Sequence, residues 1–397
     1  MSAVQHSERA HALLSASGAS RWLSCPPSAR LEESVPESRS EYAEEGTVAH
    51  ELSEVYLRRR ILICDSKERQ RLDRELKKIK KNEFYNAEME NAVQEYVEVV
   101  SERFMEAKAR SVDAIALLEE RLDFSEWVPE GYGTGDVVLI ADGVMEIIDL
   151  KYGKGVPVSA EGNSQMKLYG LGAWSAYNFL YNITEVRMTI IQPRLDSVST
   201  ASMLVEDLLE WAETKVKPLA KQAFDGEGEF KAGEHCRWCK VKGNCRARAD
   251  ANMEALAYEF QDPALLTSDE VGSILFITEQ LKAWAKDVEE YAHNQALKGN
   301  LIPQWKLVEG RSNRTITDKE EAIKIFEAEQ LEPKKFLKPQ ELLGISALEK
   351  NIGKKEFNKM LGKLILKPPG KPVLVPETDT RLELNSVEGD FGDEIFD

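Results

Sequence analysis

Cysteine is scarce in this chain: five residues in 397 are far too few for a scaffold held by disulfides. A long uncharged apolar run is also missing, so we expect no membrane span. The first residues lack a basic segment followed by an apolar core, which argues against a signal peptide. With 42% hydrophobic and 30% charged residues, the chain is typical of a globular protein of two or three domains. Together these features predict a cytoplasmic protein.

Positive charge is in deficit. The chain has 52 lysine and arginine residues against 69 acidic ones, a formal net charge of −17. Such a chain is not a general coat for nucleic acid, which needs a basic surface. An enzyme that acts on nucleic acid needs only a local basic lining and bound cations. The charge therefore does not exclude such an enzyme.

The middle of the chain changes from helical periodicity to short β-branched runs. Helical segments precede residue 110, and residues 163–181 have helical spacing again. The runs expected to form strands are residues 114–124, 135–140, 144–150 and 185–192. The first three are separated by tight turns and are expected to pair antiparallel. This α-β-β-β-α-β order predicts an α/β fold with a mixed central sheet flanked by helices.

The C-terminal part has weaker patterns. Residues 1–255 carry all the candidate functional residues and are expected to form one domain. Residues 256–376 are expected to be mainly helical and hold no catalytic constellation. Residues 377–397 are acidic and predicted to be a disordered tail. The role of these last two segments does not follow from the sequence.

A pair of aspartates and a lysine mark two neighbouring strands. Asp136 opens one predicted strand and Asp149 lies near the end of the next, so a hairpin would bring both carboxylates to one end of the sheet. Lys151 lies two residues after Asp149 and shares its face. The main-chain carbonyl of Leu150 supplies a third oxygen. This set suits Mg²⁺ or Mn²⁺, which would activate a water molecule positioned by Lys151. The alternative is a turn residue beside a solvated strand edge.

Three further residues extend this group. Gln165 and Tyr169 lie four apart on one helical face shortly after Lys151, where they could hydrogen-bond a metal-bound water or a phosphate. His50, one of five histidines, could supply a metal ligand from an N-terminal helix. The alternative is an amphipathic helix with Tyr169 in the core and a structural histidine.

In this order, the motifs resemble those of the RecB-like branch of the PD-(D/E)XK nuclease superfamily. The branch includes iron–sulfur exonucleases, among them CRISPR-associated ones and the nuclease modules of bacterial helicase–nucleases. The phrase IIDLKYGKGVPVSAEGNSQMKLYGLGA at 147–173 is still more similar to a phage and prophage family that carries this domain. The resemblance covers roughly residues 12–250.

The resemblance implies a restriction-endonuclease-like sheet and a role for each matching residue. Lys151 would be the catalytic lysine, and Gln165 and Tyr169 the supporting motif. Asp149 stands where many members have glutamate. The metal ligands would be His50, Asp136, Asp149 and the Leu150 carbonyl.

The cysteines form a second candidate site. Cys236, Cys239 and Cys245 lie within ten residues in a basic setting that favours thiolates, and Cys25 is the natural fourth ligand. A triplet with one distant cysteine is similar to the [4Fe–4S] pattern of this family and would staple the two ends of the domain; Zn²⁺ is the alternative. Cys64 is expected to be an ordinary buried residue. The neighbouring Trp22 and Trp238 would either pack around the cluster or stack on bases.

These features predict a Mg²⁺- or Mn²⁺-dependent DNA nuclease, with exonuclease action on DNA ends or single strands in phage replication or recombination. We expect it in the cytoplasm of a bacterial host, with phage single-strand-binding or recombination proteins as candidate partners. The alternative is a nuclease-like subunit that binds DNA or a partner in a recombination complex with little catalysis of its own.

Overall fold

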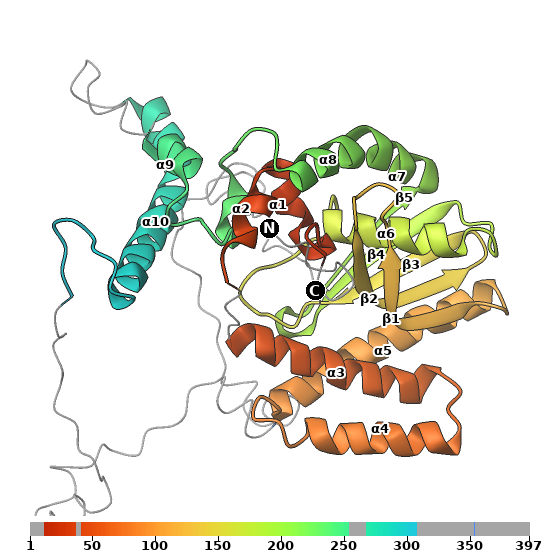
Figure 1. The fold of residues 1–397 in the computed structure, drawn as a ribbon. Helices are drawn as coiled ribbons and strands as arrows, with labels where there is room; N and C mark the ends of the chain where they lie inside the picture. The colour runs from red at the N-terminus through yellow and green to blue at the C-terminus, as the bar shows by residue number, and fades with distance from the viewer. Residues whose placement is uncertain (1–11, 37–40, 254–266, 308–352, 354–397) are drawn as a thin grey trace, which may run out of the picture. The chain divides into compact units, whose positions relative to one another are not determined.

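A five-stranded mixed sheet is the centre of the computed structural model (Figure 1). The structure describes residues 12–36, 41–253, 267–307 and 353. Neighbouring strands pair in the order β1-β2-β3-β4-β5, and their bounds are Ile115–Asp123, Tyr132–Ala141, Val144–Leu150, Glu185–Gln192 and Ser197–Leu204. Only β3 and β4 pair in parallel. The mixed sheet predicted from the sequence is confirmed.

The parallel pair follows from the chain path. β1, β2 and β3 form an antiparallel meander, as predicted. Helix α6 (Ser164–Tyr177) then returns the chain so that β4 runs alongside β3 in the same direction. The last strand, β5, was not predicted, because its serine- and threonine-rich sequence has no apolar run. Its side chains alternate between half-buried and exposed, as expected at a sheet edge.

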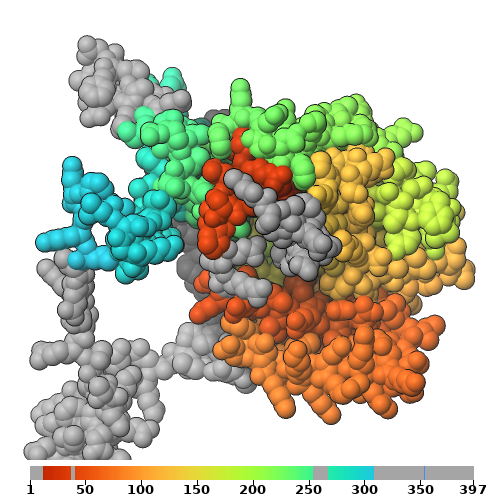
Figure 2. Space-filling model, in the orientation of Figure 1, coloured from red at the N-terminus to blue at the C-terminus, as the bar shows by residue number. Residues whose placement is uncertain are grey.

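Helices cover both faces of the sheet (Figure 1). One face packs against α3 (Glu41–Ile61) and α5 (Ala87–Arg110), and α4 (Ser66–Ile79) packs on α3. The other face packs against α6, with α7 (Val205–Trp211) beside β5; α8 (Lys217–Asp225) contributes to the same hydrophobic core further from the strands. In Figure 2 the orange surface of α3–α5 lies below the yellow and green surfaces of the sheet and of α6–α8.

Each face has its own hydrophobic core, because alternate residues of a strand point to opposite sides. On β3, Ile148 joins the core with Leu52 of α3 and Tyr96 of α5. Its neighbour Ile147 joins the opposite core with Leu168 of α6. The strand is therefore buried on both faces, and the polar residues at its C-terminal end lie at the rim of two packed layers.

Short N-terminal helices lie beside α8. Helices α1 (Ala19–Ser24) and α2 (Ser28–Glu33) both contact α8, and α1 also contacts a 3₁₀ helix, η5 (Glu234–Trp238). The start of the described chain is thus next to the segment that carries the cysteine triplet.

The described C-terminal part is helical, as predicted. The 30-residue α10 (Ser268–Leu297) lies in the predicted helical region 256–376, and the short α9 (Arg246–Met253) precedes that region. The chain divides into two compact units, residues 1–295 and 296–397. The predicted tail at 377–397 and most of the predicted region 256–376 lie outside the described residues. Within the part that the structure describes, no helix has the length and apolarity needed to cross a bilayer.

Candidate functional site

The ends of β2 and β3 bring the two predicted aspartates together. Val137 pairs with Ile148 in the antiparallel register, so the next residues outward, Asp136 and Asp149, belong to the same rung. The Asp136 carboxylate oxygen Oδ2 accepts a hydrogen bond from the main-chain N–H of Leu150 at 2.7 Å. The hairpin thus places both carboxylates at one end of the sheet, as the spacing predicts.

Asp149 and Lys151 form a network with the two predicted residues of α6. Lys151 Nζ lies 2.9 Å from Asp149 Oδ2 and donates to Gln165 Oε1 at 3.0 Å. Gln165 Nε2 in turn donates to Asp149 Oδ1 at 3.2 Å and to the Tyr169 hydroxyl at 3.4 Å. The amide of Gln165 therefore holds the acid and the lysine in fixed positions.

Local sequence explains how α6 reaches these residues. The Asn163 side chain caps the helix by accepting a hydrogen bond from the Met166 N–H at 3.2 Å. A Cβ atom at Gly133 would lie 2.7 Å from the Tyr169 ring, so glycine at this position makes room for the tyrosine over β2. The cap fixes where the helix begins, and the glycine lets it approach the sheet.

A third group lies at this end of the sheet, where β2 begins and β3 ends, a place called the sheet edge below. It contains one residue that was not predicted. His50 of α3 lies with its Nδ1 atom 3.3 Å from Asp136 Oδ1. Glu119 of β1 joins them, and one ligand atom from each of these three residues lies within 4.8 Å of the others. In the described part of the chain, no other set of three histidine, cysteine or acidic residues has ligand atoms within this distance of one another.

Glu119 was not predicted because only the pairing of β1 with β2 places it in the cluster. The register pairs Leu118 with Val137 and Glu120 with Gly135, which places Glu119 beside Asp136. Its φ of 52° is in the left-handed region, which is uncommon for a residue other than glycine. In the sequence it is one of two adjacent glutamates in an ordinary strand pattern, and nothing distinguishes it from Glu120.

The titration behaviour of these groups reflects crowded negative charge. Burial alone would lower the pKa of the His50 imidazole, but the carboxylates, Asp136 foremost, outweigh it and raise the pKa to about 9. Burial, together with repulsion from Asp136, raises the pKa of Glu119 to about 7. The cluster therefore carries more negative charge than its setting stabilises, which is the condition under which a cation binds well.

Asp149 is buried more deeply, and its partner Lys151 is half-buried. Burial raises the pKa of Asp149 even though the Lys151 ammonium opposes the change. For Lys151, burial lowers the pKa, but the Asp149 carboxylate prevails and raises it. Asp149 Oδ2 is fully buried and has only this ion pair, with no well-aligned hydrogen bond. A buried carboxylate oxygen with an unused lone pair is a suitable cation ligand.

The histidine–carboxylate cluster and the lysine network meet at Leu150. Its N–H donates to Asp136 on the β2 side, whereas the N–H of Lys151 donates to Ile191 of β4. The N–H and C=O of one strand residue point towards the same neighbouring strand, so the Leu150 carbonyl also faces the β2 side. The structure therefore brings His50, Asp136 and Glu119 into one cluster and holds Asp149 next to it in the lysine network.

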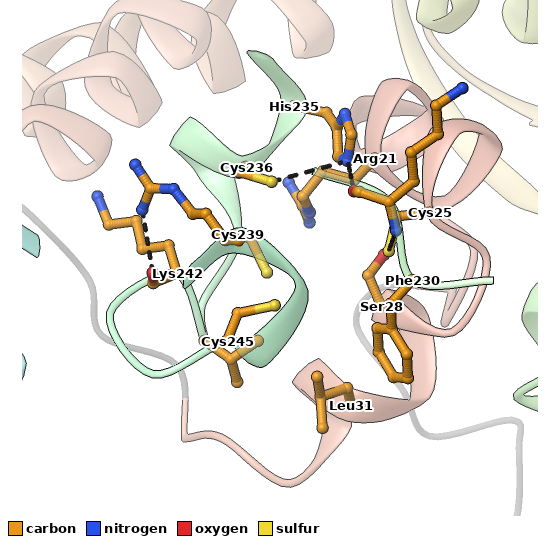
Figure 3. Close-up of a pocket in the computed structure, with 13 residues that line it drawn as sticks. Arg21, Cys25, Ser28, Leu31, Phe230, His235, Cys236, Cys239, Lys242 and Cys245 are labelled. Atoms are coloured by element: carbon orange, nitrogen blue, oxygen red, sulfur yellow. Dashed lines mark hydrogen bonds between the residues drawn. The ribbon is translucent and has the colours of Figure 1, made fainter. Parts of the chain in front are cut away.

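The four predicted cysteines line one pocket, shown in Figure 3. Cys25 follows α1, and Cys236, Cys239 and Cys245 lie on η5 and the loop after it, a segment called the cysteine loop (residues 230–246) below. The first three are buried and Cys245 is half-buried. The Cys25 sulfur accepts a hydrogen bond from the Lys231 N–H at 3.5 Å.

The four thiols of the pocket are soft ligands of the kind that bind zinc or iron, but their sulfur atoms do not surround a single point. In a tetrahedral zinc site with bonds of about 2.3 Å, the sulfurs lie roughly 3.8 Å apart. Among the described cysteines, no three have sulfurs within 4.8 Å of one another. The cavity between them is only about 20 Å³, roughly the space of one water. A single zinc ion would therefore require the cysteine loop to adjust.

The sequence suggested that basic neighbours lower the pKa of these thiols. Cys239 does not follow this expectation. Burial raises the pKa of Cys239 to about 12, and the nearby Glu32 carboxylate acts in the same direction. Without metal this thiol is protonated at neutral pH. Cys64 lies apart from the pocket, at the edge of the core on the α3–α5 face, and donates to the Arg58 carbonyl at 3.3 Å.

The fold and these two groups define a mixed α/β protein with a histidine–carboxylate cluster at the sheet edge and a four-cysteine pocket. A family model described as "Protein of unknown function (DUF2800)" matches residues 11–382, and the chain belongs to this family. Among solved structures it is similar to one described as "Crystal structure of SSO0001", with 14% identity and a TM-score of 0.22. That match covers 56% of this chain and 94% of the other. A TM-score this low supports no conclusion about fold or function.

Proposed function

We propose that this protein is a metal-dependent DNA nuclease of the RecB-like PD-(D/E)XK type, with exonuclease action on the ends or single strands of DNA in phage replication or recombination. The observation that carries the proposal is the sheet edge, where His50, Glu119 and Asp136 crowd together beside the paired Asp149 and Lys151. Glu119 and Asp136 are half-buried and Asp149 is buried, and such a concentration of carboxylates is costly for a protein that does not use it.

The residues at this edge fit Mg²⁺ or Mn²⁺. Carboxylate and carbonyl oxygens are the ligands these ions prefer, and Mn²⁺ also accepts an imidazole nitrogen. His50, Glu119 and Asp136 would hold the ion, with Asp149 and the Leu150 carbonyl on its other side. When bound, the ion would lower the pKa of a water ligand and offset charge on the scissile phosphate.

Lys151 would assist the attack on phosphorus. Its ammonium is fixed by Asp149 and by Gln165, so it is already oriented before DNA arrives. Because Asp149 raises its pKa, Lys151 stays charged at neutral pH. It would therefore orient the attacking water and stabilise the developing phosphate charge, and would not act as a general base.

The four-cysteine pocket would hold a [4Fe–4S] cluster. Its sulfurs stand wider apart than a single zinc ion requires, and the Cys25 sulfur already accepts a main-chain N–H, as cluster ligands do. Bound there, the cluster would join α1 to the cysteine loop across about 200 residues of sequence. Its role would be structural.

The test is a digestion assay with end-labelled DNA. Anaerobically purified protein should degrade single- or double-stranded DNA with Mg²⁺ or Mn²⁺, and Asp149→Asn or Lys151→Ala should lower the rate at least roughly a thousandfold, equivalent to about 4 kcal/mol of lost transition-state stabilisation. Asp142→Asn, in the exposed turn at the far end of the same hairpin, is the matched control and should cleave normally.

Two results would reject the nuclease assignment. One is parental activity in both Asp149→Asn and Lys151→Ala, which would trace the cleavage to a contaminant. The other is retention of DNA without any product under all metal conditions, which would favour the alternative of a binding subunit. Iron and zinc analysis of the same preparation decides between the two metals at the cysteine pocket.

A further inference from the structure

The two tryptophans near the cysteines have opposite environments. Trp22 of α1 is 2% exposed and donates its indole N–H to the Ser15 carbonyl at 3.0 Å. Trp238, between Cys236 and Cys239, is 60% exposed. The first therefore packs in the core, whereas packing does not explain the second.

The exposed indole lies in a strongly cationic segment. The cysteine loop contains five lysine and arginine residues and one acidic residue, Glu234, in a chain whose net charge is −17. The guanidinium of Arg237 lies over the Trp238 ring, 5.3 Å from its centroid. A flat aromatic face beside a cation is the arrangement that stacks on unpaired bases while the charge contacts the backbone phosphate.

Neighbouring residues hold the Arg237–Trp238 pair in place. Cys236 and Cys239, which flank the Arg237–Trp238 pair, are both buried. The N–H of Lys240 donates to Glu32 Oε1 at 2.8 Å, and the other oxygen of Glu32 lies 3.0 Å from the Arg21 guanidinium. The loop is thus tied to α2 immediately after the tryptophan. An aromatic side chain displayed on a fixed loop loses little entropy on binding.

We propose that Trp238 and Arg237 form a stacking site for single-stranded DNA on the cysteine loop. The inference rests on the proposed function for the identity of the nucleic acid, but it concerns binding and not cleavage. It also assigns the loop a second role, because the same segment that carries three of the four thiols presents the aromatic face.

The experiment measures binding of a fluorescein-labelled thymidine oligonucleotide by anisotropy, in EDTA so that no cleavage occurs. Trp238→Ala should weaken binding roughly 5- to 150-fold, the range for loss of one stacked base. Trp238→Phe should stay within about threefold of the parent because it keeps a ring. Arg237→Gln should reduce the slope of log affinity against log salt by about 0.7. Blunt duplex DNA, whose bases are already stacked, should respond little to Trp238→Ala.

Trp305→Ala is the control for exposure, since Trp305 is 79% exposed outside the cysteine loop. It should bind like the parent. Iron content and visible spectrum of each variant report whether the pocket is intact, and Trp238→Phe maintains the test if Trp238→Ala disturbs it. The inference is overturned if Trp238→Ala binds single strands like the parent, if single-strand and duplex affinity fall equally, or if the parent does not bind single strands.

These outcomes are separable from the nuclease proposal. Cleavage by the parent together with normal binding by Trp238→Ala would overturn only the stacking site. Trp238-dependent binding by a parent that never cleaves would overturn only the nuclease and leave the stacking site in place.

Discussion

The sheet edge and the cysteine pocket differ in what holds their ligands. At the sheet edge, His50, Glu119 and Asp136 come from a helix and two strands that are fixed by two large cores. At the pocket, Cys25 and the triplet lie on short helices and loops around a cavity of about 20 Å³. The folded chain alone positions the ligands of the sheet edge, whereas metal binding at the cysteine pocket would itself stabilise the fold. On the proposed function, this difference distinguishes a catalytic metal site from a structural one.

The largest expected effect tests the staple. Cys236→Ser should remove the cluster and lower the free energy of unfolding by several kcal/mol, because binding of a structural metal group is coupled to folding. Thermal unfolding followed by circular dichroism, together with iron content, measures this change. Cys64→Ser is the matched control, since Cys64 lies outside the pocket, and it should keep both its iron and most of its stability. Equal behaviour of the two variants would contradict the staple.

The next effect concerns the ion at the sheet edge. Because the ligands are already in place, removing Mn²⁺ should leave the protein folded, and adding it should stabilise by mass action. At a concentration 100 times the dissociation constant, the gain is about 2.7 kcal/mol. Calorimetry of the parent with and without Mn²⁺ measures the shift. Unfolding of the metal-free protein at room temperature would show that this site, too, depends on its metal for folding.

Sequence patterns located most of the sheet edge because their spacing has direct geometric meaning. The hairpin register places Asp136 next to Asp149, and the four-residue step from Gln165 to Tyr169 puts both on one face of α6. Glu119 could not be found this way, because its place beside Asp136 depends on the pairing of β1 with β2.

The fold was predictable to a similar extent and for similar reasons. The apolar strands β1–β4 were expected, since burial imposes a pattern on their sequences. The edge strand β5 carries no such pattern. The environment of the thiols was also beyond sequence reasoning: basic neighbours suggested a lowered pKa, whereas burial dominates at Cys239. Proximity in sequence gives the charges near a group but not its exposure.

Glu119 provides a smaller and sharper test of the sheet edge. Glu119→Gln should weaken Mn²⁺ affinity and lower the cleavage rate roughly 10- to 100-fold, an effect of the size found when one group supporting a metal site is lost. Titration calorimetry with Mn²⁺ and the digestion assay measure the two effects. Glu120→Gln, one residue away on β1, is the control, because Glu120 bonds to the Tyr177 hydroxyl and not to the cluster. If the two variants retain equal Mn²⁺ affinity, Glu119 is not a ligand.

The smallest effect lies in the helical layer that supports His50. Glu90 of α5 accepts hydrogen bonds from the hydroxyls of Tyr56 at 2.6 Å and Tyr85 at 2.7 Å, and Lys80 lies 3.5 Å away. Burial alone would raise the pKa of Glu90, but these partners prevail and lower it below its ordinary value of 4.5. Glu90→Gln should therefore cost about 1 kcal/mol of stability at neutral pH, a modest figure because the side chain is one-quarter exposed.

The sign of the pH dependence follows from the lowered pKa. The contribution of ionised Glu90 is fully present above pH 4.5 and is lost as the pH falls through the lower pKa of the folded state. The stability difference between the parent and Glu90→Gln should therefore shrink on acidification, as measured by urea unfolding at a series of pH values. Glu95→Gln, at an exposed position of the same helix, is the control variant for the loss of one negative charge. A difference that persists unchanged below the lowered pKa would show that Glu90 stabilises α3 and α5 by packing and not by its charge, and would leave the position of His50 independent of this carboxylate.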